Sequence, residues 1–179
     1  QYNVTNVIDS SDLLLTNLLT GETVSLSGQG TVVSADVGAN KTVTSVNLAL
    51  TGANAGNYTL NSYTTSFEIL PKVINLTGTK VYDGLTTVPN ASLTVTTGVS
   101  GQSLDLKGSG SVISAATGNG KTISIGTLEL DSTGSGSDSN YTLSGGNHTF
   151  NVTARPLTFS SSRNYDGTTT ANTSALTYT

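Results

Sequence analysis

Lys80-Val81-Tyr82-Asp83-Gly84 is matched by Arg163-Asn164-Tyr165-Asp166-Gly167, 83 residues further along the chain. The same spacing separates Asn57-Tyr58-Thr59-Leu60 from Asn140-Tyr141-Thr142-Leu143. A stretch that returns at a fixed spacing indicates a tandem repeat, in which each copy folds as one unit and contacts its neighbours. The repeat therefore predicts architecture rather than a single active site.

The boundaries of the copies follow from the spacing. Residues 21–50 match residues 101–130 at a spacing of 80, and the three extra residues of the second copy fall in the Gly/Ser/Asp-rich stretch 131–139, which predicts a longer loop. We expect a first repeat over residues 1–71 that lacks its N-terminal strand, a complete repeat over 72–154, and the start of a third over 155–179. Prolines at 71 and 156 are expected to stiffen the linkers.

Apolar residues alternate with polar ones, as in Leu104/Leu106, Ile123/Ile125 and Phe150/Val152, and helical periodicity is nearly absent. The pattern predicts an all-β chain of tandem small antiparallel β-sandwich (Ig-like) repeats arranged end to end. The alternative is a β-grasp-like unit with one short helix, for which Ala35 to Asn40 is the candidate. The positions expected to be buried are Leu26, Leu48, Leu50, Tyr58 and Phe67, and in the second copy Leu106, Ile123, Leu128, Leu130, Tyr141 and Phe150.

Composition excludes several classes of function. Only 10% of the residues are charged and the net charge is −4, so the chain cannot present the positive surface that nucleic acid requires. Ser and Thr together account for 56 of the 179 residues, which predicts a neutral, hydroxyl-rich surface. Cysteine is absent, which excludes disulfides. No apolar run reaches the roughly 20 residues that a transmembrane helix needs.

No group of residues predicts catalysis. His148 is the one histidine, and its matched position in the first copy is Thr65. Asp131 to Asp138 and the pair Asp9 and Asp12 lack the ligand spacing of an EF-hand, so solvated loops are the better interpretation. We therefore expect no enzyme activity, no cofactor and no metal.

Tyr82-Asp83-Gly84 and Tyr165-Asp166-Gly167 are each expected to form a turn, in which Asp bonds a backbone N–H, Gly supplies a positive φ and Tyr packs on the core. Lys80 and Arg163 are matched cations, and Asp83 and Asp166 are their expected partners. The matched lysines Lys41 and Lys121 are either surface residues or donors of a Lys–Asn isopeptide bond.

Nine Asn-x-Ser/Thr sequons occur in the chain, and two of them, Asn57 and Asn140, lie in the repeated Asn-Tyr-Thr-Leu motif. These two are the candidate glycosylation sites. An unmodified β-surface is the alternative, since a chain rich in Ser and Thr forms such sequons by chance.

The order Gly52-Ala53-Asn54-Ala55-Gly56-Asn57-Tyr58-Thr59-Leu60, then Ile69-Leu70-Pro71-Lys72, then Lys80 to Gly84 resembles the YDG repeat of large bacterial surface exoproteins, including filamentous-haemagglutinin-like adhesins exported by two-partner secretion. The second copy departs from it, because Ser135 to Asn140 replaces the Gly-Ala-Asn-Ala-Gly-Asn run.

The resemblance implies a stalk module of an extracellular, cell-surface adhesin, with no catalytic residues. The expected partners are neighbouring repeats, with host or matrix glycans or self-association as further possibilities. The alternative function is a carbohydrate-binding module of an extracellular protein.

Overall fold

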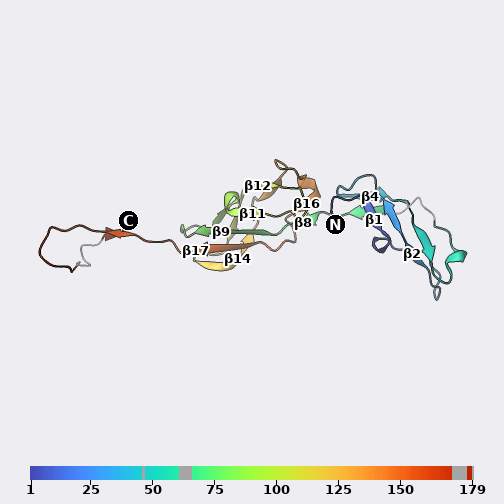
Figure 1. Ribbon diagram of the computed structural model, residues 1–179, viewed down its shortest axis with the longest axis horizontal. Coiled ribbons are helices and arrows are strands. Elements are labelled where there is room, and N and C mark those ends of the chain that lie inside the picture. Colours follow the sequence, from blue (N-terminus) through green and yellow to red (C-terminus); the bar gives the residue numbers. More distant parts are fainter. Residues whose placement is uncertain (46, 61–65, 171–176, 179) are drawn as a thin grey trace.

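The computed structural model describes residues 1–45, 47–60, 66–170 and 177–178. The molecule is elongated, with residues 1–71 (the first segment) at one end, residues 72–154 (the second segment) in the middle and residues 155–179 (the tail) at the other end (Figure 1). The N-terminus lies beside the joint between the two segments rather than at an end of the molecule. The expectation of an all-β chain is confirmed.

Short strands separated by glycine and polar turns build the first segment. They are β1 (Val7–Asp9), β2 (Ser25–Ser27), β3 (Gln29–Thr31), β4 (Gly38–Thr42), β5 (Thr44–Ser45), β6 (Ala49–Thr51) and β7 (Ser66–Ile69). β3 pairs with β1 and β5, β2 with β6, and β4 with β7, all antiparallel.

The second segment repeats this series. Its strands are β8 (Lys72–Val73), β9 (Leu76–Val81), β10 (Thr87–Pro89), β11 (Leu93–Val95), β12 (Asp105–Lys107), β13 (Ser109–Val112), β14 (Gly118–Ser124), β15 (Glu129–Asp131), β16 (Tyr141–Thr142) and β17 (Thr149–Thr153). Six of them form one sheet in the order β10-β13-β14-β17-β9-β11. β1, β2, β3 and β6 lie 80 residues before β10, β12, β13 and β15, and β7 begins 83 residues before β17.

Strand pairing corrects one expectation. Most pairs are antiparallel, but β9 and β17 run parallel over five residues, from Thr149 beside Thr77 to Thr153 beside Val81. β8 and β16 are also parallel. The sequence predicted antiparallel pairing throughout because neighbouring strands joined by short turns are normally antiparallel. β9 and β17 are the long strands at the two ends of the segment, and alternation within a strand carries no information about such a distant partner.

The helix considered over Ala35 to Asn40 is also wrong. Residues 38–42 form β4, which pairs with β7, so the backbone there is extended. The helical turns are single 3₁₀ turns: η1 (Ser10–Asp12), η2 (Ala55–Asn57), η3 (Asn90–Ser92) and η4 (Asp138–Asn140). No helix in the described ranges is long and apolar enough to span a membrane.

The most completely buried side chains of the core lie on β9, β10 and β17. Phe150, Leu76 and Val88 are fully buried, and Ile123, Leu128 and Tyr141 are confirmed as buried. Leu106 and Leu130 are half-buried, as are all five positions expected in the first segment: Leu26, Leu48, Leu50, Tyr58 and Phe67. Phe67 differs from its match Phe150 because the ring of Phe150 lies against Gly78 of β9, and the first segment has no strand equivalent to β9 among its described residues.

In the tail, β18 (Phe159–Ser160) pairs antiparallel with β19 (Thr177–Tyr178). Residues 155–170 are all exposed, with Phe159 at 71% and Tyr165 at 96%. This part of the tail adds no buried residue to the core.

Replacing Phe150 with alanine is expected to lower the free energy of unfolding by about 3–5 kcal/mol, because the substitution leaves a cavity in a fully buried site. Phe67→Ala, at the matched half-buried position, is the control and is expected to cost less than half as much. Urea denaturation followed by circular dichroism measures both. Equal losses would contradict the difference in burial.

Candidate interaction surface at the joint between the segments

The Tyr-Asp-Gly motif forms the turn that was predicted. The backbone N–H of Leu85 donates to the Oδ1 of Asp83 at 2.9 Å, and Gly84 adopts a φ of 79°, in the left-handed region that glycine tolerates best. The hydrogen bond from Leu85, with that from Lys80, holds the pKa of Asp83 below its ordinary value. The folded turn therefore favours the ionised form of Asp83.

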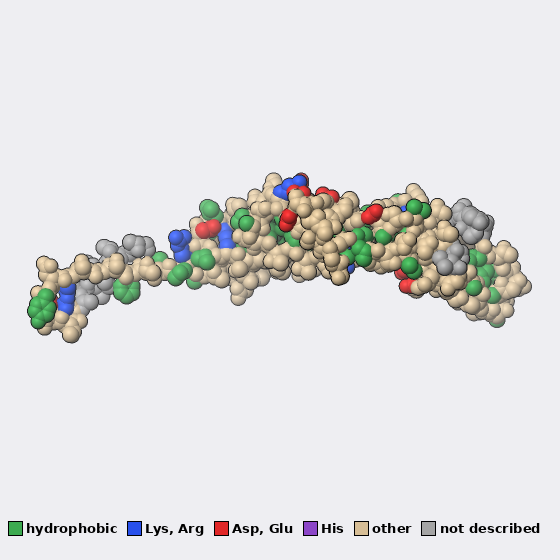
Figure 2. Space-filling model, turned by 45° about the horizontal axis from the view of Figure 1, so that its top comes forward, with side chains coloured by type: hydrophobic (Ala, Val, Ile, Leu, Met, Phe, Trp, Pro, Cys, Tyr) green, Lys and Arg blue, Asp and Glu red, His purple; other side chains and the backbone are tan. Residues whose placement is uncertain are grey.

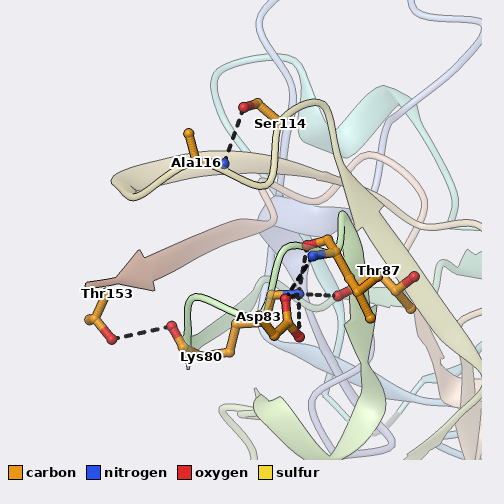
Figure 3. Close-up of polar contacts among 7 residues, drawn as sticks. Lys80, Asp83, Thr87, Ser114, Ala116 and Thr153 are labelled. Atoms are coloured by element: carbon orange, nitrogen blue, oxygen red, sulfur yellow. Dashed lines mark hydrogen bonds and ion pairs between the residues drawn. The ribbon is translucent and has the colours of Figure 1, made fainter. Parts of the chain in front are cut away.

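Lys80 lies at the centre of this turn (Figure 3). Its ammonium lies 3.0 Å from the Oδ1 of Asp83 and donates to the carbonyl oxygens of Leu85 and Thr87 at 2.9 and 2.7 Å. The side chain of Lys80 is only 8% exposed although the turn is at the surface. The expected pairing of Lys80 with Asp83 is confirmed, and the cation closes the turn by contacting four oxygens of three residues.

The tail repeats the arrangement. Arg163 pairs with Asp166 at 3.1 Å and also donates to the carbonyl oxygens of Thr168 and Thr170. Gly167 has a φ of 73°, and the N–H of Thr168 donates to Asp166, which lowers the pKa of Asp166. A guanidinium thus replaces an ammonium without a change in the turn.

A third copy of the turn, missed by the sequence analysis, lies at the N-terminus. In Tyr2-Asn3-Val4 the N–H of Thr5 donates to the Oδ1 of Asn3 at 3.1 Å, and Val4 has a φ of 64°. Only the tyrosine is shared with Tyr82-Asp83-Gly84, but the positions differ by 80, the spacing that relates residues 21–50 to 101–130. That spacing was the signal that could have revealed it.

The tyrosine of this third copy lies in the joint between the segments. Tyr2 is 4% exposed, and its ring meets the ring of Tyr141 edge to face, with centroids 5.4 Å apart. The side-chain amide of Gln102 donates to the hydroxyl of Tyr2 at 2.7 Å and accepts from the hydroxyl of Tyr141 at 2.5 Å. Burial and the nearby Tyr2 raise the pKa of Tyr141.

Asn140 provides a second link across the joint. Its Oδ1 accepts the backbone N–H of Val37 at 2.8 Å, and its Nδ2 donates to the carboxylate of Asp36 at 2.9 Å. Hydrogen bonds from Ser34 and then Asn140 hold the pKa of Asp36 below its ordinary value. Asn140 is 2% exposed, and both polar atoms of its side chain bond residues of the first segment.

The two repeated motifs thus meet at one joint. The Asn-Tyr pair of the second segment, with Gln102, forms a socket, and Tyr2 with the N–H of Val37 forms a plug that enters it. The tyrosines of the other two Tyr-Asp-Gly turns do not pack on a core as expected: Tyr82 is 41% and Tyr165 96% exposed. Of the three motif tyrosines, Tyr2 is the one whose ring is seen against the other segment.

The remaining candidate residues lie away from the joint or are fully engaged. The Nζ of Lys41 donates to the carbonyl oxygen of Ser34, and an isopeptide bond at Lys41 or Lys121 stays a prediction. His148 is buried, accepts the N–H of Leu76 through Nδ1 and donates through Nε2 to Leu143, so it supports the core.

Glycosylation of Asn57 and Asn140 also stays a prediction. A glycan on Asn140 and the bond to Asp36 would exclude one another, whereas Asn57 is exposed.

Val4→Gly is expected to raise the free energy of unfolding of the first segment by about 1 kcal/mol, because it relieves a β-branched residue in the left-handed region. Gly84→Ala is the matched opposite change. A Cβ at Gly84 meets no atom within 4 Å, so its expected cost of about 1 kcal/mol is purely conformational. A destabilised Val4→Gly protein in urea denaturation would contradict the equivalence of the two turns.

Asp83→Asn is expected to remove part of the acid sensitivity of the second segment. Because the folded-state pKa of Asp83 is lowered, its contribution to stability is present above about pH 4 and is lost as the pH falls through the folded value. The first segment carries Asn3 at this position and serves as the internal reference. Thermal unfolding between pH 2 and 6 checks this. An unchanged pH profile in the variant would sink the assignment.

The comparisons with known proteins agree with the duplication. The family model described as the YDG domain matches residues 1–66 and again residues 70–149. No curated protein matches the chain. No solved structure matches it either. Since the two matches together cover most of the 179 residues, the chain belongs to the YDG domain family.

Proposed function

We propose that this chain is a non-enzymatic stalk module of a bacterial cell-surface or secreted adhesin, which spaces and presents adhesive regions outside the cell. The observation that carries the proposal is the joint, where Tyr2 and Asn140 link two segments of the same family end to end. Contacts that join one unit end to end with the next make the molecule longer. The resemblance of the motifs to the repeats of surface exoproteins supports the extracellular location.

The finer architecture belongs to this proposal. We take residues 1–71 and 72–154 as tandem units and residues 155–179 as the start of a third, with the matched strand positions and the two family matches in support. Ig-like sandwiches are built from antiparallel sheets, so the central parallel pair β9 and β17 supports the β-grasp-like alternative, without its helix.

The surface suits a spacer. Charged side chains are few and scattered over a surface of polar groups and backbone (Figure 2). The three described ion pairs each join a Lys or Arg to an Asp of the same segment or of the tail, and none crosses the joint. Exposed ion pairs weaken with salt, whereas the joint uses hydrogen bonds, one of them to the carboxylate of Asp36, and ring packing. The rod is therefore expected to keep its length in high salt.

Removing the contacts of the joint is expected to reduce the average end-to-end length of the molecule. In small-angle X-ray scattering, the Tyr2→Ala/Asn140→Ala double variant is expected to show a lower radius of gyration and a broader distance distribution than the wild type, because the linker alone cannot hold one orientation. Tyr165→Ala is the matched control: it removes the same type of side chain from the tail, where it is 96% exposed, and should leave the curve unchanged. Identical curves for all three proteins would mean that the contacts do not set the shape.

The adhesin role is tested on cells. In the full-length protein, removal of residues 1–154 is expected to reduce adhesion, and replacement by an unrelated rod of equal length should restore it. Restoration by length alone supports a spacer. Glycan binding by the isolated chain on an array, together with failure of the unrelated rod, would favour the carbohydrate-binding module instead.

A further inference from the structure

The first segment carries its own copy of the socket at the end away from the joint. Tyr58, Glu22 and Asn57 match Tyr141, Gln102 and Asn140 of the joint and form the distal socket. The hydroxyl of Tyr58 donates to the carboxylate of Glu22, as Tyr141 does to Gln102. This bond raises the pKa of Tyr58. The distal socket is therefore assembled although no segment covers it in the structure described.

Exposure shows what the distal socket lacks. Asn140 is 2% and Tyr141 5% exposed in the joint, whereas Asn57 is exposed and Tyr58 half-buried. The hydroxyl of Tyr58 also accepts the N–H of Leu19 at 3.2 Å, so its ring is held in place. In the joint, the ring of Tyr2 lies against Tyr141 and the N–H of Val37 bonds Asn140.

The second segment carries the complementary end, the distal plug, made of Tyr82 and Thr117. The N–H of Tyr82 donates to the carbonyl oxygen of Thr153 at 2.9 Å, and that of Tyr2 donates to the carbonyl oxygen of Leu70 at 2.9 Å. Each tyrosine is therefore held by the same backbone bond at the end of the last strand of its segment. Tyr82 is 41% exposed against 4% for Tyr2.

The turn that precedes Thr117 also matches its counterpart in the joint. The N–H of Ala116 donates to the Oγ of Ser114 at 3.3 Å, as that of Asp36 does to Ser34 at 3.1 Å (Figure 3). This places Thr117 at the position of Val37, and Thr117 is exposed where Val37 is half-buried.

We infer that the distal plug of one molecule docks in the distal socket of a second copy, so that the chain associates head to tail through the geometry of its own internal joint. In this contact Tyr82 meets Tyr58 edge to face, and its hydroxyl donates to the carboxylate of Glu22, where Gln102 donates to Tyr2 in the joint. The Oδ1 of Asn57 accepts the N–H of Thr117. The inference rests on the joint and is independent of the adhesin role.

The distal plug and the distal socket are different surfaces, so the contact is heterologous and the assembly stays open and linear. The occupant is another unit of this kind, because the surface presented matches a plug that is already seen in place. Charge fits as well: a Tyr hydroxyl can donate to a carboxylate, and the distal plug brings Ala116 rather than a second carboxylate like Asp36 toward Glu22.

The test uses the whole chain in sedimentation velocity over a concentration series. The weight-average mass of the wild type is expected to rise with concentration, and Tyr82→Ala and Tyr58→Ala are each expected to remain monomeric. An equimolar mixture of the two variants should form dimers and stop there, because each variant keeps one working end. Tyr165→Ala, which removes an exposed motif tyrosine from the tail, is the matched control and should behave as the wild type.

The hydrogen bond to Glu22 has its own test. Tyr82→Phe is expected to weaken association by about tenfold, since a bond to a charged group is lost. Glu22→Gln recreates the chemistry of Gln102 and should keep association, whereas Glu22→Ala should reduce it. A monomeric wild type at every concentration, or association that neither end variant changes in folded protein, would overturn the proposal.

Discussion

The parallel pairing of β9 with β17 determines at which end of the segment the Tyr-Asp-Gly turn lies. It brings the first long strand of the segment beside the last, with Val81 level with Thr153. The residue after β9 therefore emerges at the end of the segment where the tail begins. That residue is Tyr82, whose N–H bonds the carbonyl oxygen of Thr153. A motif near the start of the unit is thus carried to its far end.

This placement explains why matched residues differ in burial. Tyr2, Tyr82 and Tyr165 occupy the same position in the same turn, yet their exposed fractions are 4%, 41% and 96%. Internal packing cannot account for the series, because the turn itself is alike in all three. The presence of a neighbouring socket accounts for it: Tyr2 has one against it, and the other two do not.

Much of the fold could be read from the sequence. Alternation predicted strands, the spacings of 80 and 83 predicted the recurrence of their positions, and the turn at Asp83 followed from the known chemistry of Asx residues and glycine. The partnership of Lys80 with Asp83 was also predicted, because the two are close in sequence.

The joint could not be read in the same way. Tyr2 and Gln102 lie 100 residues apart, and Asn140 and Val37 lie 103 apart, so no local pattern connects them. Tyr2-Asn3-Val4 shares only tyrosine with the motif. Val4 has a positive φ, which a glycine at this position would have indicated but a valine does not. The parallel strand pair was missed for the same reason, since its two strands are far apart in the chain.

The substitution of Asp36 by Ala116 at the next equivalent position has a mechanical consequence. A joint built on Ala116 would lack the bond that the amide of Asn140 makes to the carboxylate of Asp36. Units linked in series all bear the same pulling force, so the joint with fewer bonds yields first. In a rod of such units, the number of hydrogen bonds in each joint would set the order in which the joints open under load. The joints would open one at a time while each folded unit stays intact.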